Sequence, residues 1–446
     1  MQKTGHRHPC RGPSPPSTQQ TIYRAAFLSA TRIASTKLFV RALTSRQTLV
    51  ILTGLNLFNY FDRYVLSAVL PSLQGELKLD DSQAGHLATV FMLGYFLTSP
   101  FFGWLGDRAS RKWLIAGGIF IWSASTVMTG FSATLGILLF WRAMVGVGEA
   151  SYATISPAWL SDVYPPEKRN NALTIFYTAI PIGAALGSVA GGWIAATSGW
   201  RHAFIWAGAP GLLLALLLLP FQEPARSTAS KGDQPPSGWR GVLALFTRRD
   251  YNLSVWGYTA YTFALGAMAH WGPSFLHRAH HLAIPQAAEF FGYVLVGAGL
   301  SGTLLGGLAA TAWQKRHPSG YAGTLALSML LAAPSAYWAF TATTPNASMT
   351  ALAVAMFCCF LGTGPINTLI LESAPPALRA SAMAGSIFMI HLFGDMWSPG
   401  IVGQLSDRWQ SLGQALLILP GVLLLAGLLW GALAWCQSRS PRPAQS

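Results

Sequence analysis

Apolar residues occur along this chain in long blocks that short polar connections separate. Between Lys112 and Arg142 there are 29 residues without Asp, Glu, Lys or Arg, and between Arg316 and Glu372 there are 55. A membrane-spanning helix needs about 20 mostly apolar residues, and it satisfies its own backbone hydrogen bonds where water is absent. The blocks therefore predict membrane-spanning helices, and the longest block has room for two.

The length and spacing of the blocks predict an all-α membrane protein with twelve spans. The expected spans are 48–72, 83–106, 113–131, 135–160, 171–196, 203–220, 252–276, 288–311, 321–341, 347–371, 380–404 and 412–436. Composition agrees, because only 10% of the residues are charged and 52% are hydrophobic. A soluble domain carries about 25% charged residues.

The net charge of +14 is explained by membrane topology. With both chain ends in the cytoplasm, 23 Lys and Arg fall on the inner side, whereas only Lys78, Arg201, Arg278 and Arg408 fall outside. This asymmetry is the positive-inside bias of membrane proteins, so we expect no nucleic-acid partner. The short loops suggest a bacterial inner (cell) membrane.

A polar segment over residues 222–250, rich in Pro, Ser, Gly and charge, divides six spans from six. We expect it to be a cytoplasmic linker between an amino-terminal half, 47–221, and a carboxy-terminal half, 251–437. A basic cytoplasmic segment, 1–46, precedes them, and a short tail, 438–446, follows. Residues 1–46 contain no acid, and they are either a helix on an anionic membrane face, a targeting peptide or, as we expect, disordered.

The two halves repeat one pattern after their fourth span. Asp162, Pro165, Pro166 and Arg169 recur 210 residues later as Glu372, Pro375, Pro376 and Arg379. Repeated six-helix units of parallel topology usually enclose a site at the middle of the membrane.

Four charged residues inside predicted spans are the main candidates for function: Asp62 and Arg63 in the first span, and Arg142 and Glu149 in the fourth. Each costs on the order of 3 kcal/mol at the centre of a membrane helix, so each calls for a reason. Arg142 and Glu149 are seven apart, on one helical face and roughly 10 Å apart along the axis. They form either a structural ion pair or an anion site in which the glutamate exchanges a proton; we favour the second, since Asp62 and Arg63 add more charge than one pair needs.

His391 and Asp395 form a secondary polar site in the eleventh span. Their spacing of four suits a hydrogen bond on one helical face, and a structural and a functional role stay equally open. The first cytoplasmic loop carries Gly103, Asp107 and two arginines, Arg108 and Arg111. Glycine permits close helix contact, and the aspartate can cap a helix or pair with arginine.

Other chemistry has little support in the sequence. Histidines 270, 277, 280 and 281 are not joined by a carboxylate or thiolate at ligand spacing, so we expect no metal. No nucleotide-binding or nucleophile motif is present, so we expect no cofactor and no enzymatic activity. Transport would then be driven by an ion gradient or by the substrate's own gradient.

Several motifs carry a resemblance to a known family. The loop from Gly103 to Lys112, with Ser110 in place of the usual glycine, and Arg142-x-x-x-Gly146-x-Gly148-x-Ala150 resemble signatures of the major facilitator superfamily. Within it, three strings resemble the Spinster family over about residues 48–436. They are Asn59-Tyr60-x-Asp62-Arg63, Gly148-Glu149-Ala150 and His391-x-x-Gly394-Asp395-x-x-Ser398-Pro399-x-x-x-Gly403-x-x-Ser406-Asp407.

Because Spinster proteins carry lysolipids, the resemblance implies an amphiphilic substrate with an anionic or zwitterionic head group. It assigns Asp62, Arg63, Arg142 and Glu149 to the head group and to proton coupling. It also implies that Asp107 and Arg108, with Gly103 and Arg111, lock a cytoplasmic gate between halves that rock in alternating access. We expect a monomer in the lipid bilayer.

Two alternatives stay open. The first is a facilitator for a small organic anion, a sugar acid or a drug, which would use the same Arg142 and Glu149. The second, from another class, is a membrane receptor or scaffold that transports nothing.

Overall fold

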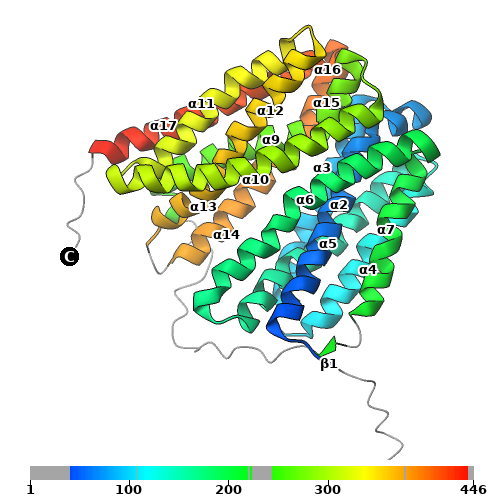
Figure 1. Ribbon diagram of the computed structural model, residues 1–446, viewed down its shortest axis with the longest axis horizontal. Helices are drawn as coiled ribbons and strands as arrows, with labels where there is room; N and C mark the ends of the chain where they lie inside the picture. The colour runs from blue at the N-terminus through cyan, green and yellow to red at the C-terminus, as the bar shows by residue number, and fades with distance from the viewer. Residues whose placement is uncertain (1–40, 107, 219–220, 223–243, 376–377, 440–446) are drawn as a thin grey trace, which may run out of the picture.

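A computed structural model describes residues 41–106, 108–218, 221–222, 244–375 and 378–439, which form two six-helix bundles side by side (Figure 1). The amino-terminal bundle contains α2 (Ser45–Leu77), α3 (Asp81–Gly106), α4 (Arg111–Gly130), α5 (Leu135–Val163), α6 (Pro166–Ser198) and α7 (Trp200–Leu217). The carboxy-terminal bundle contains α9 (Arg249–His280), α10 (Ile284–Arg316), α11 (Gly320–Thr341), α12 (Pro345–Leu361), α13 (Thr363–Glu372), α14 (Arg379–Ile390), η2 (His391–Asp395), α15 (Ser398–Trp409), α16 (Leu412–Leu416) and α17 (Ile418–Arg439).

Within this described part of the chain, the twelve predicted spans are confirmed. Three spans of the carboxy-terminal bundle are interrupted, since α12 continues as α13, α14 continues through η2 into α15, and α16 continues as α17. Helices also extend beyond the predicted apolar cores. α2 begins at Ser45 because Thr44 and Gln47 form a capping box, and it ends where Lys78 adopts a left-handed conformation with φ of 52°.

Seven spans combine the length and apolar character that a membrane crossing requires, among the described helices. α2 and α5 are not in that group. These two helices hold the buried side chains of Asp62, Arg142 and Glu149.

One short pair of β-strands lies outside the helices. β1 (Arg41–Ala42) pairs in parallel with β2 (Phe221–Gln222), so the segment before α2 lies beside the segment that follows α7. Most of the basic segment, most of the linker and the end of the tail lie outside the described residues.

The backbones of α2 and α6 approach each other closely inside the amino-terminal bundle. A Cβ added at Gly187 of α6 would lie 2.1 Å from the carbonyl oxygen of Phe61 in α2. A side chain is therefore excluded at this position, and its absence lets the two backbones touch. The small residues of the fifth span thus form a contact surface for the first span.

The most extensive contacts between the bundles are those of α6 with α10 and of α3 with α15. The contacts involve the start of α3, near Gly85, and the last third of α6, near Gly192. Both regions lie at the end of the molecule that carries the α2–α3 turn, which we call the α2–α3 end. The connection between α3 and α4 lies at the opposite end, the α3–α4 end.

Candidate functional site

Arg63 and Glu149 form an ion pair in the interior of the amino-terminal bundle. Nη2 of Arg63 in α2 donates to Oε2 of Glu149 in α5 at 2.5 Å, and Nε donates to the same oxygen at 3.2 Å. The Glu149 side chain is fully buried, whereas 24% of the Arg63 side chain is exposed. The guanidinium is therefore the member of the pair that a ligand can reach.

Aromatic rings surround the Arg63 guanidinium. Its central carbon lies 4.9 Å from the ring centres of both Tyr60 and Phe91, and 5.6 Å from that of Tyr95. Ring faces attract a cation and exclude water from it. This arrangement holds the guanidinium in place when its carboxylate partner moves away.

Arg142 also contacts Phe91, with its guanidinium carbon 5.0 Å from that ring centre. The residue is only 2% exposed, and its Nε and Nη1 have no hydrogen-bond partner among the described residues. Arg142 and Glu149 share a helical face, but Glu149 pairs with Arg63 of another helix, so the alternative of a structural Arg142–Glu149 ion pair is not formed here.

Asp62 is hydrogen-bonded to a residue of α4. Its Oδ2 accepts a hydrogen bond of 2.5 Å from the Thr126 hydroxyl of α4, and its Oδ1 has no partner among the described residues. Neighbouring residues of a helix do not face the same side, so Asp62 and Arg63 bind different helices. Of the four charged candidates, Arg63 and Arg142 thus share the Phe91 ring, Glu149 pairs with Arg63, and Asp62 binds Thr126 of α4.

The predicted hydrogen bond between His391 and Asp395 is present, with Nδ1 at 3.0 Å from Oδ1. Both residues belong to η2, a π-helical segment in which Gly394 has non-helical backbone angles. Such segments are frequent at functional sites. The His391 ring also lies 6.2 Å from the ring of Tyr95 in the other bundle, so the pair faces the interface of the two halves.

A cavity between the bundles connects these groups. Arg63, Phe91 and Arg142 line it from the amino-terminal bundle, while His270 of α9 and Asp395 of η2 line it from the other. Its volume of about 150 Å³ is below the roughly 300 Å³ of a typical small-molecule pocket. The halves are therefore drawn close together around it in this state.

The candidate gate residues lie at the α3–α4 end. Arg111 forms an ion pair with Asp162 of its own half, and Arg108 donates to the Trp104 carbonyl at 3.1 Å and stacks on the Trp104 ring. A Cβ at Gly103 would lie 3.6 Å from the Thr154 side chain, so this glycine is not needed for close approach. Asp107 lies outside the described residues.

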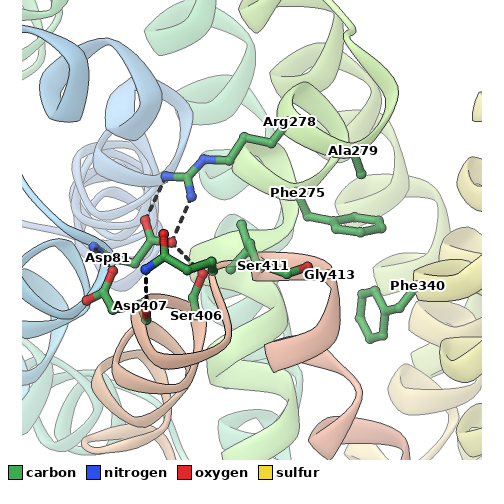
Figure 2. A pocket seen from close by; sticks show the side chains of 11 residues that line it. Asp81, Phe275, Arg278, Ala279, Phe340, Ser406, Asp407, Ser411 and Gly413 are labelled. Carbon is green, nitrogen blue, oxygen red and sulfur yellow. Dashed lines mark hydrogen bonds and ion pairs between the residues drawn. The ribbon is translucent and has the colours of Figure 1, made fainter.

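A polar cluster at the α2–α3 end joins the halves and was not predicted (Figure 2). Asp81 of α3 accepts from both terminal nitrogens of Arg278 in α9, each at 2.8 Å, and from the Ser406 hydroxyl at 2.5 Å. Gln74 of α2 donates to Asp81 and accepts from Arg278. Asp407 of α15 accepts from the backbone N–H groups of Asp81 and Ser82, so one half caps a helix of the other. We call Gln74, Asp81, Arg278, Ser406 and Asp407 the Asp81 cluster.

Signals for this cluster were present in the sequence. Arg278 is one of only four basic residues assigned to the outer side, and Ser406 and Asp407 end the longest string of the family resemblance. His270 was considered only as a metal ligand. The free-energy cost of a histidine inside an apolar span already indicates that this residue has a specific role.

Comparisons with known proteins agree with this architecture. Residues 52–394 match the model of the Major Facilitator Superfamily. The chain is 33% identical to Protein spinster homolog 1 of Xenopus tropicalis over 87% of this chain and 77% of that protein. It is 32% identical to the Sphingosine-1-phosphate transporter SPNS2 of Xenopus tropicalis, over 85% of this chain and 79% of that protein.

The match to Protein spinster of Drosophila melanogaster has 32% identity over 81% of this chain, and it spans 62% of the Drosophila protein's length. Among solved structures, a bacterial homologue of the human lysosomal transporter Spinster, in an inward-facing and unoccupied conformation, superposes with a TM-score of 0.80. It has 21% sequence identity and covers 89% of this chain and 99% of its own. These relatives are transporters and not enzymes. With the twelve-helix fold, they show that the chain is an integral membrane transporter of the major facilitator superfamily and belongs to its Spinster family.

Proposed function

We propose that this protein is a secondary active transporter that moves a lysolipid-like amphiphile with an anionic or zwitterionic head group, with a proton as the coupling ion. The observation that carries the proposal is the ion pair of Arg63 with buried Glu149. Beside it, on the cavity between the halves, Nε and Nη1 of Arg142 have no hydrogen-bond partner among the described residues. The 32% identity to a protein named as a sphingosine-1-phosphate transporter supports the substrate class.

Coupling follows from the cost of unpaired charge in a buried site. An anionic head group that binds Arg63 competes with Glu149 for the same guanidinium. The displaced carboxylate would be left buried without a cation, which costs several kcal/mol, on the order of 3 or more. A proton on Glu149 removes that cost, so head-group binding and proton binding favour each other. Asp62, buried beside Thr126, is the second site for the proton.

The state described here supports alternating access. The Asp81 cluster holds the α2–α3 end closed, and the positive-inside bias places that end outside the cell. Substrate would then reach the cavity from the cytoplasmic, α3–α4 end, where Arg111 pairs within its own half. Gly103, Asp107, Arg108 and Arg111 would close that end in the other state, as the family resemblance implies.

The hydrocarbon chain of the substrate needs an apolar path. Phe96 of α3 and Phe388 of α14 lie with ring centres 5.0 Å apart across the interface of the halves. Both follow the head-group cavity toward the α3–α4 end, since Phe96 is one residue beyond Tyr95 and Phe388 is three before His391. We assign the chain of the amphiphile to this surface.

The small cavity favours a second candidate, a small organic anion that uses Arg142 and Glu149 without an apolar chain. To separate the two, protein in liposomes is tested for uptake of labelled lysophospholipid and of labelled gluconate. Wild type is compared with Arg142→Ala and with Arg249→Ala, whose side chain is 66% exposed.

The proposal expects saturable lysolipid uptake that falls at least tenfold in Arg142→Ala and is unchanged in Arg249→Ala. Gluconate uptake without competition by lysolipids would favour the small-anion candidate. No flux of either compound, in protein shown to be folded, would favour a receptor or scaffold.

A further inference from the structure

Glu289 places a carboxylate on the lipid-facing side of α10. Its Oε1 accepts a hydrogen bond of 2.5 Å from the hydroxyl of Tyr293, which lies one turn later and is 61% exposed. Gly297 and Ser301 continue the same exposed stripe along the helix. Among the described residues, no basic side chain forms an ion pair with Glu289. Ionisable residues inside spans almost always face the protein interior, so a carboxylate on the lipid side calls for a reason.

The position of Glu289 along α10 is that of the lipid head groups. α10 has 33 residues and is about 50 Å long, at 1.5 Å per residue. The hydrocarbon core is about 30 Å thick, so about 10 Å of a centred helix extends into the head-group region at each end. Glu289 is about 8 Å from the first residue of α10, at the α2–α3 end. Its carboxylate is therefore within reach of the head groups of that leaflet.

A groove between α10 and α12 begins beside Glu289 and runs toward the middle of the membrane. Tyr293 and Ser301 mark its ends on α10, and Thr350 and Phe357 mark them on α12. Its volume is about 430 Å³. From Glu289 to Ser301, α10 rises about 18 Å, and the hydrocarbon of one leaflet is about 15 Å deep. This α10–α12 groove thus has the length of one acyl chain that descends from a head group at Glu289.

We infer that the α10–α12 groove, with Glu289 at its mouth, binds a phospholipid whose head group carries a primary ammonium, as in phosphatidylethanolamine. The ammonium group donates to the Glu289 carboxylate, and one acyl chain lies between α10 and α12. Charge complementarity selects this occupant, because the carboxylate repels an anionic lipid and a trimethylated choline has no N–H group to donate. The site lies on the outer surface of the carboxy-terminal bundle, apart from the central cavity, and does not depend on the proposed substrate.

The test measures binding of the first lipid to full-length protein by native mass spectrometry. Phosphatidylethanolamine and phosphatidylcholine with identical acyl chains are the probes, so only the methylation of the ammonium group differs. The variants are Glu289→Gln, which removes the charge, and Val354→Trp, which fills the groove that Val354 lines. Glu76→Gln is the matched control, since the Glu76 side chain is 53% exposed at the same end but belongs to the amino-terminal half. Thermal unfolding verifies that every variant is folded.

Wild type and Glu76→Gln should bind phosphatidylethanolamine about tenfold more tightly than phosphatidylcholine, since only the first lipid donates a hydrogen bond to the charged group. Glu289→Gln should weaken phosphatidylethanolamine binding about fivefold and leave phosphatidylcholine binding unchanged. Val354→Trp should weaken binding of both lipids. Equal affinities for the two lipids in wild type, or an unchanged phosphatidylethanolamine affinity in either Glu289→Gln or Val354→Trp, would overturn the inference.

Discussion

Arg278 of α9 donates through both terminal nitrogens to the two carboxylate oxygens of Asp81 in α3, each at 2.8 Å, across the interface of the halves. A bidentate pair of this kind fixes geometry more strongly than a single hydrogen bond. Because Ser406 and Gln74 also donate to Asp81, the carboxylate is the centre at which α2, α3, α9 and α15 meet (Figure 2). The α2–α3 end is therefore closed by directed polar contacts and not by apolar packing alone.

Asp81→Asn should weaken this closure and shift the protein toward the state open at the α2–α3 end. Loss of a hydrogen bond to a charged group costs about 1.5–3 kcal/mol, so the open fraction should rise roughly tenfold. The measurement is the rate at which a membrane-impermeant thiol reagent modifies a cysteine placed at Ser67, which lines the central cavity. The reagent is added on the α2–α3 side of proteoliposomes, in protein without its native cysteines.

Glu76→Gln is the control for that experiment. Glu76 pairs with Arg201 at the same end of the molecule, but both residues belong to the amino-terminal half. The labelling rate should therefore stay at the wild-type value. An equal rise in both variants would mean that the Asp81 cluster does not hold the halves together.

Gly187→Ala should destabilise the amino-terminal bundle. The added Cβ would lie 2.1 Å from the Phe61 carbonyl oxygen, so α2 and α6 must separate. The expected cost is about 1–3 kcal/mol, as for overpacking of a core, and it is measured as a fall in the thermal unfolding midpoint in detergent. Gly54→Ala in α2 is the control, because nothing lies within 4 Å of its Cβ and alanine favours the helix. Equal midpoints for the two variants would contradict the close α2–α6 contact.

Thr126→Val should destabilise the protein by about 1–2 kcal/mol, since it removes the donor to buried Asp62 without changing the shape of the side chain. Asp62→Asn should cost less, because its amide oxygen can still accept from Thr126. Chemical or thermal unfolding compares the single variants with the double variant. Additive effects would show that the two side chains do not interact, against the geometry described here.

The twelve spans could be predicted because a membrane imposes a length and an apolar character on each helix. Length and apolar character do not predict where a span is interrupted or where its helix begins and ends. The interruption at η2 depends on Gly394 and on the contact of His391 with Tyr95, which is a tertiary relationship. The extension of α2 to Leu77 continues past the apolar block, and its ends are set by the caps at Thr44 and Lys78.

The charged residues of the site could also be predicted, because a charge inside a membrane span has a high free-energy cost. Their pairing could not be predicted. Glu149 has Arg142 on its own helical face and Arg63 on another helix, and only the rotation of α2 against α5 decides that Arg63 is its partner. Likewise, the hydrogen bond from Thr126 of α4 to Asp62 is a tertiary contact that the sequence does not indicate. Asp81 lies between two predicted spans, where an acidic residue needs no special explanation. Only the structure shows that Arg278 lies beside it.

In the proposed mechanism, head-group binding at Arg63 and protonation of Glu149 are coupled. Protein in liposomes is tested for uptake of a labelled lysophospholipid with and without an inward proton gradient, comparing wild type with Glu149→Gln, which mimics the protonated carboxyl group. Wild-type uptake should rise severalfold with the gradient, and Glu149→Gln should bind the lysophospholipid yet show no response to the gradient. A wild type indifferent to the gradient, or a variant that responds like wild type, would contradict the account.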